Sequence, residues 1–145
     1  MTSNRFAWVV SGAVLLLVVV TGLLVAMQPR TDIAPGSPAD AVQRYVKAVM
    51  AGDHDRAAEL FSTDSTCDAA DLDRSYADKR SRVDLIDTVL NGDRARVQIS
   101  IVVTSDDLVQ NTWAEERTIR LHKTDGQWLI TGIPWPLYEC GVLSK

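Results

Sequence analysis

Residues 91–103 read NGDRARVQISIVV and carry the clearest structural signal in the chain. The opening triplet Asn-Gly-Asp is typical of a tight turn between two antiparallel strands. After this turn the odd-numbered residues from 95 to 103 are all apolar, whereas the even-numbered residues from 94 to 100 are all polar. Because side chains of a β-strand alternate between its two faces, this pattern predicts a strand with one buried face.

The sequence on both sides of this strand extends it into an antiparallel sheet of about four strands. Residues 83–90 alternate before the turn, and residues 111–123 form a third predicted strand. A Thr-Asp-Gly turn at 124–126 leads to a fourth predicted strand at 127–133, which Pro134 ends. These segments predict a β-meander.

The stretch SPADAVQRYVKAVMAGDHDRAAELF, residues 37–61, predicts a pair of helices before the sheet. Ser37 is a favourable N-cap, apolar residues then recur with helical spacing, and Gly52 is a favourable stop. Asp53 caps a second, shorter helix, whose apolar stripe is Ala57, Leu60 and Phe61. A short third helix is expected around residues 68–78.

The N-terminal 36 residues predict a membrane anchor and a tether. Residues 6–27 carry no charge and would form a helix about 33 Å long, enough to cross a bilayer. No good cleavage site follows, so a retained anchor is favoured over a cleaved signal peptide or a buried soluble helix. We expect residues 1–5 in the cytoplasm, residues 28–36 as the tether, and residues 37–145 as an extracytoplasmic domain at the plasma membrane.

The two cysteines and the charge balance bear on location and partners. Cys67 and Cys140 both lie beyond the apolar stretch, and an even number in an exported domain favours a disulfide between them. Two separate buried thiols are the alternative.

From Thr31 onward 13 Lys and Arg stand against 19 Asp and Glu, a net charge of −6. Nucleic acid is therefore not an expected partner.

This layout resembles the NTF2-like superfamily, a cone-shaped α+β fold, over about 100 residues. The resemblance is carried by the stretch at 37–61, by NGDRARVQISIVV, and by KTDGQWLITGI at 123–133. The membrane-anchored form is similar to small actinobacterial envelope proteins, including those associated with Mce lipid-import systems. The resemblance implies a helix pair packed on a curved antiparallel sheet, with a cavity between them that enzymes of the superfamily use.

Two residues are candidates for catalysis if that cavity is a site of isomerase or dehydratase chemistry. Tyr45 lies on the apolar stripe of the first helix, and Asp87 interrupts apolar residues on one face of the first strand. A carboxylate buried there would have a raised pKa and could act as a base. The favoured interpretation is that Tyr45 belongs to the core and that Asp87 lies on the wet face, with Ile86 and Leu90 packed inward.

The sequence holds no pattern of a metal or cofactor site. It lacks HxH, CxxC and HExxH spacings and a Gly-rich phosphate loop, so neither a metal nor a cofactor is expected.

The segment IPWPLYEC, residues 133–140, concentrates aromatic residues and prolines. Trp135 and Tyr138 are candidates for contact with a partner, the alternative being a packed extension over the sheet.

These observations favour a non-enzymatic, membrane-tethered accessory module of the cell envelope. We expect it to contact the bilayer through residues 6–27 and to assist a transport or secretion complex through an envelope protein partner. A carrier of a small apolar ligand and an isomerase or dehydratase remain the alternatives.

Overall fold

The structure, a computed structural model, describes residues 33–75, 77, 80–104 and 112–140. The chain divides into two units after Asp32, and the described residues all belong to the second unit, Ile33–Lys145. The predicted membrane span at 6–27 lies outside the described residues, as do residues 1–5 and most of the predicted tether. No helix in the described ranges has both the length and the apolar character needed to cross a bilayer.

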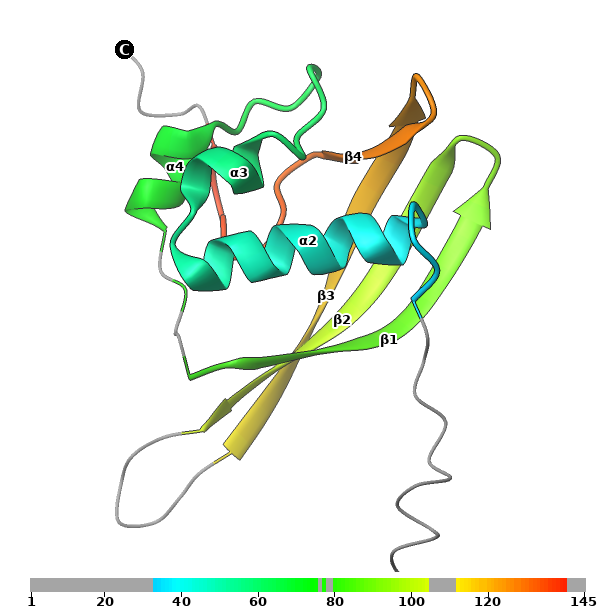
Figure 1. The fold of residues 1–145 in the computed structure, drawn as a ribbon. Helices are drawn as coiled ribbons and strands as arrows, with labels where there is room; N and C mark the ends of the chain where they lie inside the picture. Colours follow the sequence, from blue (N-terminus) through cyan, green and yellow to red (C-terminus); the bar gives the residue numbers. More distant parts are fainter. Residues whose placement is uncertain (1–32, 76, 78–79, 105–111, 141–145) are drawn as a thin grey trace, which may run out of the picture. The chain divides into compact units, whose positions relative to one another are not determined.

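Helices come first in the described part of the chain, and strands follow. The helices are α2 (Pro38–Ala51), α3 (His54–Ala58) and α4 (Ala69–Arg74), and the strands are β1 (Arg82–Asn91), β2 (Arg94–Thr104), β3 (Thr112–Thr124) and β4 (Gln127–Thr131). The strands form one antiparallel sheet in the order β1-β2-β3-β4, and α2 lies across one face of it (Figure 1). The expected α+β arrangement of helices on a four-stranded antiparallel sheet is confirmed.

The ends of α2 follow from its capping residues. The Ser37 hydroxyl accepts a hydrogen bond from the Asp40 backbone N–H at 3.2 Å, which satisfies a donor that the first turn leaves open. At the other end Gly52 adopts a left-handed conformation with φ 75°, and its N–H donates to the Val49 carbonyl at 3.0 Å. Between these caps, one face of α2 is buried, and its residues are Ala41, Val42, Tyr45, Ala48 and Val49.

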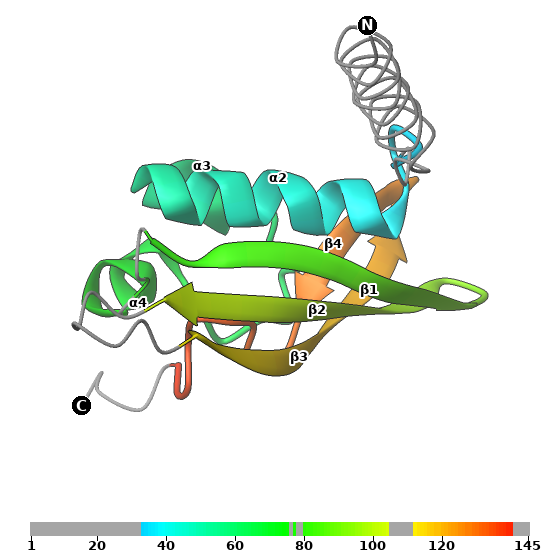
Figure 2. The ribbon, with the colours of Figure 1, turned by 90° about the horizontal axis from the view of Figure 1, so that it is seen from below.

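The core lies between this helix face and the inner face of the sheet. Its sheet side is formed by Ala95, Val97, Ile99, Ile101, Ile119, Leu121, Trp128 and Ile130. The turned view in Figure 2 shows α2 running along the strands, with α4 and the C-terminal segment together at one end of the sheet. The alternating pattern of β2 therefore separates core from solvent as predicted.

The second helix is shorter than predicted, because the free edge of β4 takes up the residues that follow it. α3 ends at Ala58. The Ile130 N–H donates to the Leu60 carbonyl at 2.7 Å, and the Ser62 N–H donates to the Ile130 carbonyl at 2.8 Å. Phe61 thus forms a parallel bridge to Ile130 instead of a last helical turn.

Two other element ends differ from the prediction. The third helix stops at Arg74, before the predicted end at residue 78, and the Ser75 N–H donates to the Leu72 carbonyl at its end. β4 stops at Thr131 rather than at residue 133, because Gly132 has a positive φ of 77° that a strand cannot continue.

A β-bulge in β1 changes which residues of that strand face the helices. Before the bulge, Val83 and Leu85 stand opposite Ile101 and Ile99 on the inner face. The register shifts between Leu85 and Asp87, so that Thr88 continues the inner face.

The bulge corrects one expectation about β1. Asp87 pairs with Gln98 on the outer face and is exposed. The expectation that Ile86 and Leu90 pack inward is wrong, because these side chains are 46% and 59% exposed. A bulge carries no alternation signal of its own, so the sequence pattern could not reveal the shift.

Candidate functional site

The C-terminal segment, residues 132–140, packs on the inner side of the sheet, beside the helices. Pro134 and Leu137 are buried, and the Leu137 N–H donates to the Pro134 carbonyl at 2.8 Å. Trp135 is half-buried and packs against the core. This segment therefore forms part of the hydrophobic core.

The hydroxyl of Tyr45 is engaged by the same segment. Tyr45 is fully buried, and its hydroxyl donates a hydrogen bond to the Trp135 carbonyl at 2.8 Å. Its ring lies 5.7 Å from the ring of Phe61, measured between centroids. Burial raises the pKa of the Tyr45 hydroxyl well above its ordinary value of 10.0, so the group is a neutral donor at physiological pH.

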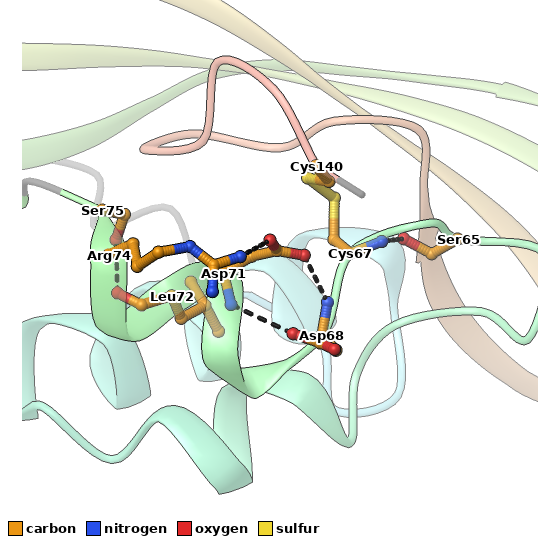
Figure 3. Close-up of polar contacts among 8 residues, drawn as sticks. All are labelled: Ser65, Cys67, Asp68, Asp71, Leu72, Arg74, Ser75 and Cys140. Carbon is orange, nitrogen blue, oxygen red and sulfur yellow. Dashed lines mark hydrogen bonds and ion pairs between the residues drawn. A yellow bond between two sulfur atoms is a disulfide. The ribbon is translucent and has the colours of Figure 1, made fainter. Parts of the chain in front are cut away.

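The predicted disulfide between Cys67 and Cys140 is present in the structure. The two residues are 73 positions apart in the sequence, and their Cα atoms are 4.9 Å apart. Figure 3 shows the bond joining the C-terminal segment to the loop just before α4, where the Cys67 N–H donates to the Ser65 hydroxyl at 3.2 Å. The segment is thus fixed covalently at one end and by the Tyr45 hydrogen bond near its middle.

A capping box supports the loop that carries Cys67. The Asp71 N–H donates to the Asp68 carboxylate, and the Asp68 N–H donates to the Asp71 carboxylate, both at 3.0 Å (Figure 3). Arg74 also pairs with the buried Asp71 carboxylate. These reciprocal bonds hold the start of α4 rigidly beside the disulfide.

The sulfur atoms of Cys67 and Cys140 and a carboxylate oxygen of Asp71 lie within 4.8 Å of one another. Metal ions bind the cysteine thiolate, and in this protein the two sulfurs are bonded to each other instead. The cluster is therefore a covalent crosslink with a neighbouring carboxylate, and in this oxidised form it does not offer a set of metal ligands.

The two candidate catalytic residues lie on opposite faces of the sheet. Tyr45 packs against the inner face, whereas Asp87 is exposed on the outer face, and its carboxylate accepts the Thr88 N–H at 2.8 Å. Tyr138 is 74% exposed, with the Arg117 guanidinium 5.8 Å from its ring centroid. Besides the two cysteines, which form the disulfide, the structure brings the candidates Tyr45 and Trp135 into contact.

An apolar groove lies between α2 and β1, in the helix–sheet interface where the resemblance implied a cavity. It has a volume of about 210 Å³, and its apolar lining includes Val42, Val46, Val83, Leu85 and Ile99. The helical stripe and the strand alternation each mark some of these residues as core. Only the placement of α2 over β1 determines that they leave a groove between them.

Comparison with known proteins yields similarity of structure alone. No protein family model and no curated protein matches the chain. Among solved structures it is similar to Rv3472 of Mycobacterium tuberculosis, a protein of unknown function, with 23% identity and a TM-score of 0.47 over 64% of each chain. The chain thus spans less than two thirds of the length of that protein.

Two further solved structures are similar at lower identity. RPA3114 of Rhodopseudomonas palustris, a SEC-C motif containing protein, is 14% identical with a TM-score of 0.48, over 69% of this chain and 79% of that one. A protein of Xanthomonas campestris, described as a calcium/calmodulin dependent protein kinase II association domain, is 17% identical with a TM-score of 0.40, over 72% and 92%. At these scores the likenesses carry no assignment of function.

Proposed function

We propose that this chain is a non-enzymatic, membrane-tethered accessory module of the bacterial cell envelope, with an NTF2-like domain. Residues 6–27 hold it in the plasma membrane, residues 1–5 lie in the cytoplasm, and the domain from residue 37 onward lies outside. There it contacts an envelope protein and assists a transport or secretion complex. The resemblance of the sequence to small actinobacterial envelope proteins, including the Mce-associated group, supports this proposal.

The observation that carries this proposal is the C-terminal segment packed on the inner face and held by the disulfide. An enzyme needs an open cavity with convergent polar groups. The Tyr45 hydroxyl is instead directed to the Trp135 carbonyl, and Asp87 lies on the other face of the sheet. A disulfide persists in oxidising compartments, which supports a location outside the cytoplasm.

Tyr138 is the residue of this segment that is best suited to contact a partner. It is 74% exposed, and it lies between Leu137 and Cys140, which are both buried. Tyrosine and arginine are favoured at binding hot spots, and here Arg117 lies over the Tyr138 ring. The covalent anchor reduces the entropy that this surface would lose on binding. Trp135 serves mainly to fix the segment.

The proposal is tested by affinity purification of the full chain from detergent-solubilised membranes at native expression. We expect an envelope protein to co-purify with the wild-type chain and to be lost with Tyr138→Ala, while thermal stability stays the same. Leu90→Ala, which truncates an exposed apolar residue of β1, is the matched control and should retain the partner. Recovery of the chain alone, or equal recovery with Tyr138→Ala, would contradict the proposal.

A carrier of a small apolar ligand is a second candidate, favoured by the groove between α2 and β1. Its volume of about 210 Å³ and aliphatic lining suit a short hydrocarbon group. Native mass spectrometry of the full chain should then detect a bound lipid or fatty acid, and Val46→Trp should displace it by filling the groove. An isomerase or dehydratase remains the third alternative, for which Asp87→Asn and Tyr45→Phe are the first substitutions to assay.

A further inference from the structure

The outer face of the sheet carries arginines that form no ion pair with any carboxylate in the part of the chain that the structure describes. In the register of β2 with β3, Arg96 stands directly opposite Arg120, and Arg94 stands opposite His122. The three arginines are exposed, and within the described residues none of them forms an ion pair. Other arginines of the domain do pair with carboxylates, namely Arg44 with Asp40, Arg74 with Asp71, Arg82 with Asp84 and Arg117 with Glu115.

These cations line two adjoining hollows. The larger, of about 630 Å³, is lined by Arg94, Arg96, Arg120 and His122, with Val89 and Thr131 beside them. The smaller, of about 310 Å³, shares Arg96, Arg120 and Val89, and adds Gln98 and Thr118. The Arg96–Arg120 pair therefore lies where the two hollows meet.

The opposition of Arg96 to Arg120 does not itself stabilise the fold. Directly opposed side chains on neighbouring strands have Cβ atoms about 5 Å apart, and like charges in that position destabilise the sheet. The side chains are exposed, so they contribute little packing that could offset this repulsion. An anion held between the two guanidinium groups would remove it, because guanidinium binds oxyanions through two parallel hydrogen bonds.

One carboxylate in the lining of each hollow limits what can bind. Asp64 lines the larger hollow and Asp87 lines the smaller one. A long polyanion lying along both hollows would meet both carboxylates, whereas a single small anionic group can be held at the Arg96–Arg120 pair, because arginines outnumber carboxylates in the lining. Since the hollows are far larger than one oxyanion, there is room for an organic group against Val89, with Thr118, Thr131 and Gln98 as hydrogen-bond partners.

We propose that the outer-face hollow binds the phosphate group of a phosphate ester, clamped between Arg96 and Arg120 and flanked by Arg94 and His122. A tetrahedral dianion matches several convergent donors better than a carboxylate does. The ester is a soluble molecule or a lipid headgroup, which share this chemistry. The site uses none of the residues of the proposed partner surface, so it stands or fails separately from the accessory function.

Calorimetric titration of the full chain in dodecyl maltoside with sn-glycerol 3-phosphate tests the site. We expect saturable binding below about 10 mM that weakens at least about tenfold in Arg96→Gln/Arg120→Gln. Glycerol and acetate should not bind. Arg44→Gln/Arg82→Gln, which removes two exposed arginines that pair elsewhere, is the matched control and should bind as the wild type does.

Thermal unfolding without added phosphate separates binding from folding. Arg96→Gln/Arg120→Gln should unfold at the same or a higher temperature than the wild type, because it relieves like-charge repulsion. Equal binding by this variant, binding of acetate as tight as that of the phosphate ester, or no binding at all would overturn the proposal. Nanodiscs containing phosphatidic acid, whose headgroup is a phosphomonoester, should compete with sn-glycerol 3-phosphate if a lipid headgroup is the source, and absence of competition would identify a soluble ester.

Discussion

Removal of the Cys67–Cys140 disulfide should destabilise the domain strongly without abolishing its fold. The bond closes a loop of 73 residues, and the chain-entropy model assigns such a crosslink about 4 kcal/mol of stability. The C-terminal segment keeps its other contacts in Cys67→Ser/Cys140→Ser, namely buried Leu137 and the Tyr45 hydrogen bond to Trp135. The variant should therefore still unfold cooperatively, at lower denaturant.

Urea unfolding of the full chain in detergent, followed by tryptophan fluorescence, measures this loss. With an unfolding slope of about 2 kcal/mol/M, a loss of 4 kcal/mol lowers the midpoint by about 2 M. The wild-type chain unfolded in the presence of a thiol reductant is the control, and it should reproduce the midpoint of the variant. A loss below about 1 kcal/mol would refute the reasoning, because the unfolded chain would then gain little freedom when the loop opens.

Substitutions at three positions test local parts of the account. Tyr45→Phe should lower the free energy of unfolding by about 1 kcal/mol at neutral pH, because the buried Trp135 carbonyl loses its donor. The raised pKa of Tyr45 means that the fold favours the neutral hydroxyl. The hydroxyl therefore contributes its full share to the free energy of unfolding below pH 10.0, and this share is lost at higher pH. As the pH rises through this range, the urea midpoint should fall less for Tyr45→Phe than for the wild type. Ser37→Ala removes the N-cap of α2 and should cost about 1 kcal/mol in urea unfolding, and an unchanged midpoint would contradict the capping role. Gly52→Ala places a side chain at φ 75° and should lower the free energy of unfolding by about 1 kcal/mol, whereas Gly52→Asn, which tolerates that conformation better, should lower it less.

Local sequence signals predicted the elements well wherever the determining residues are neighbours in the chain. The caps of α2 and the alternation of β2 each depend on residues within one or two turns or along one strand. The pattern therefore located both elements closely. The same holds for the turn before β4, where Asp125 and Gly126 both adopt positive φ.

The features that sequence reasoning missed depend on pairing between distant segments. Residues 60–62 leave the helical path because the edge of β4 offers them hydrogen bonds, and β4 lies some 70 positions later in the chain. The bulge in β1 is likewise fixed by its register with β2. The local periodicity of the sequence predicts neither the bridge to β4 nor the bulge in β1.

The candidate sites divide in the same way. The disulfide was predictable, because an even number of cysteines beyond a predicted membrane anchor favours pairing. The opposition of Arg96 to Arg120 was not, because both residues appear only as polar positions on their strands until the register of β2 with β3 is known. Tyr45 was assigned to the core stripe correctly, yet its hydrogen bond to Trp135, a separation of 90 positions, needed the structure.

Labelling of one introduced thiol in wall-stripped cells tests the central claim most directly. Gln127→Cys places a free thiol on an exposed position at the start of β4, and a membrane-impermeant maleimide reports its location. An extracytoplasmic domain with a closed disulfide predicts labelling of Gln127→Cys before lysis and no labelling of the wild-type chain. Labelling of Gln127→Cys only after lysis, or labelling of the wild-type cysteines without reductant, would contradict it.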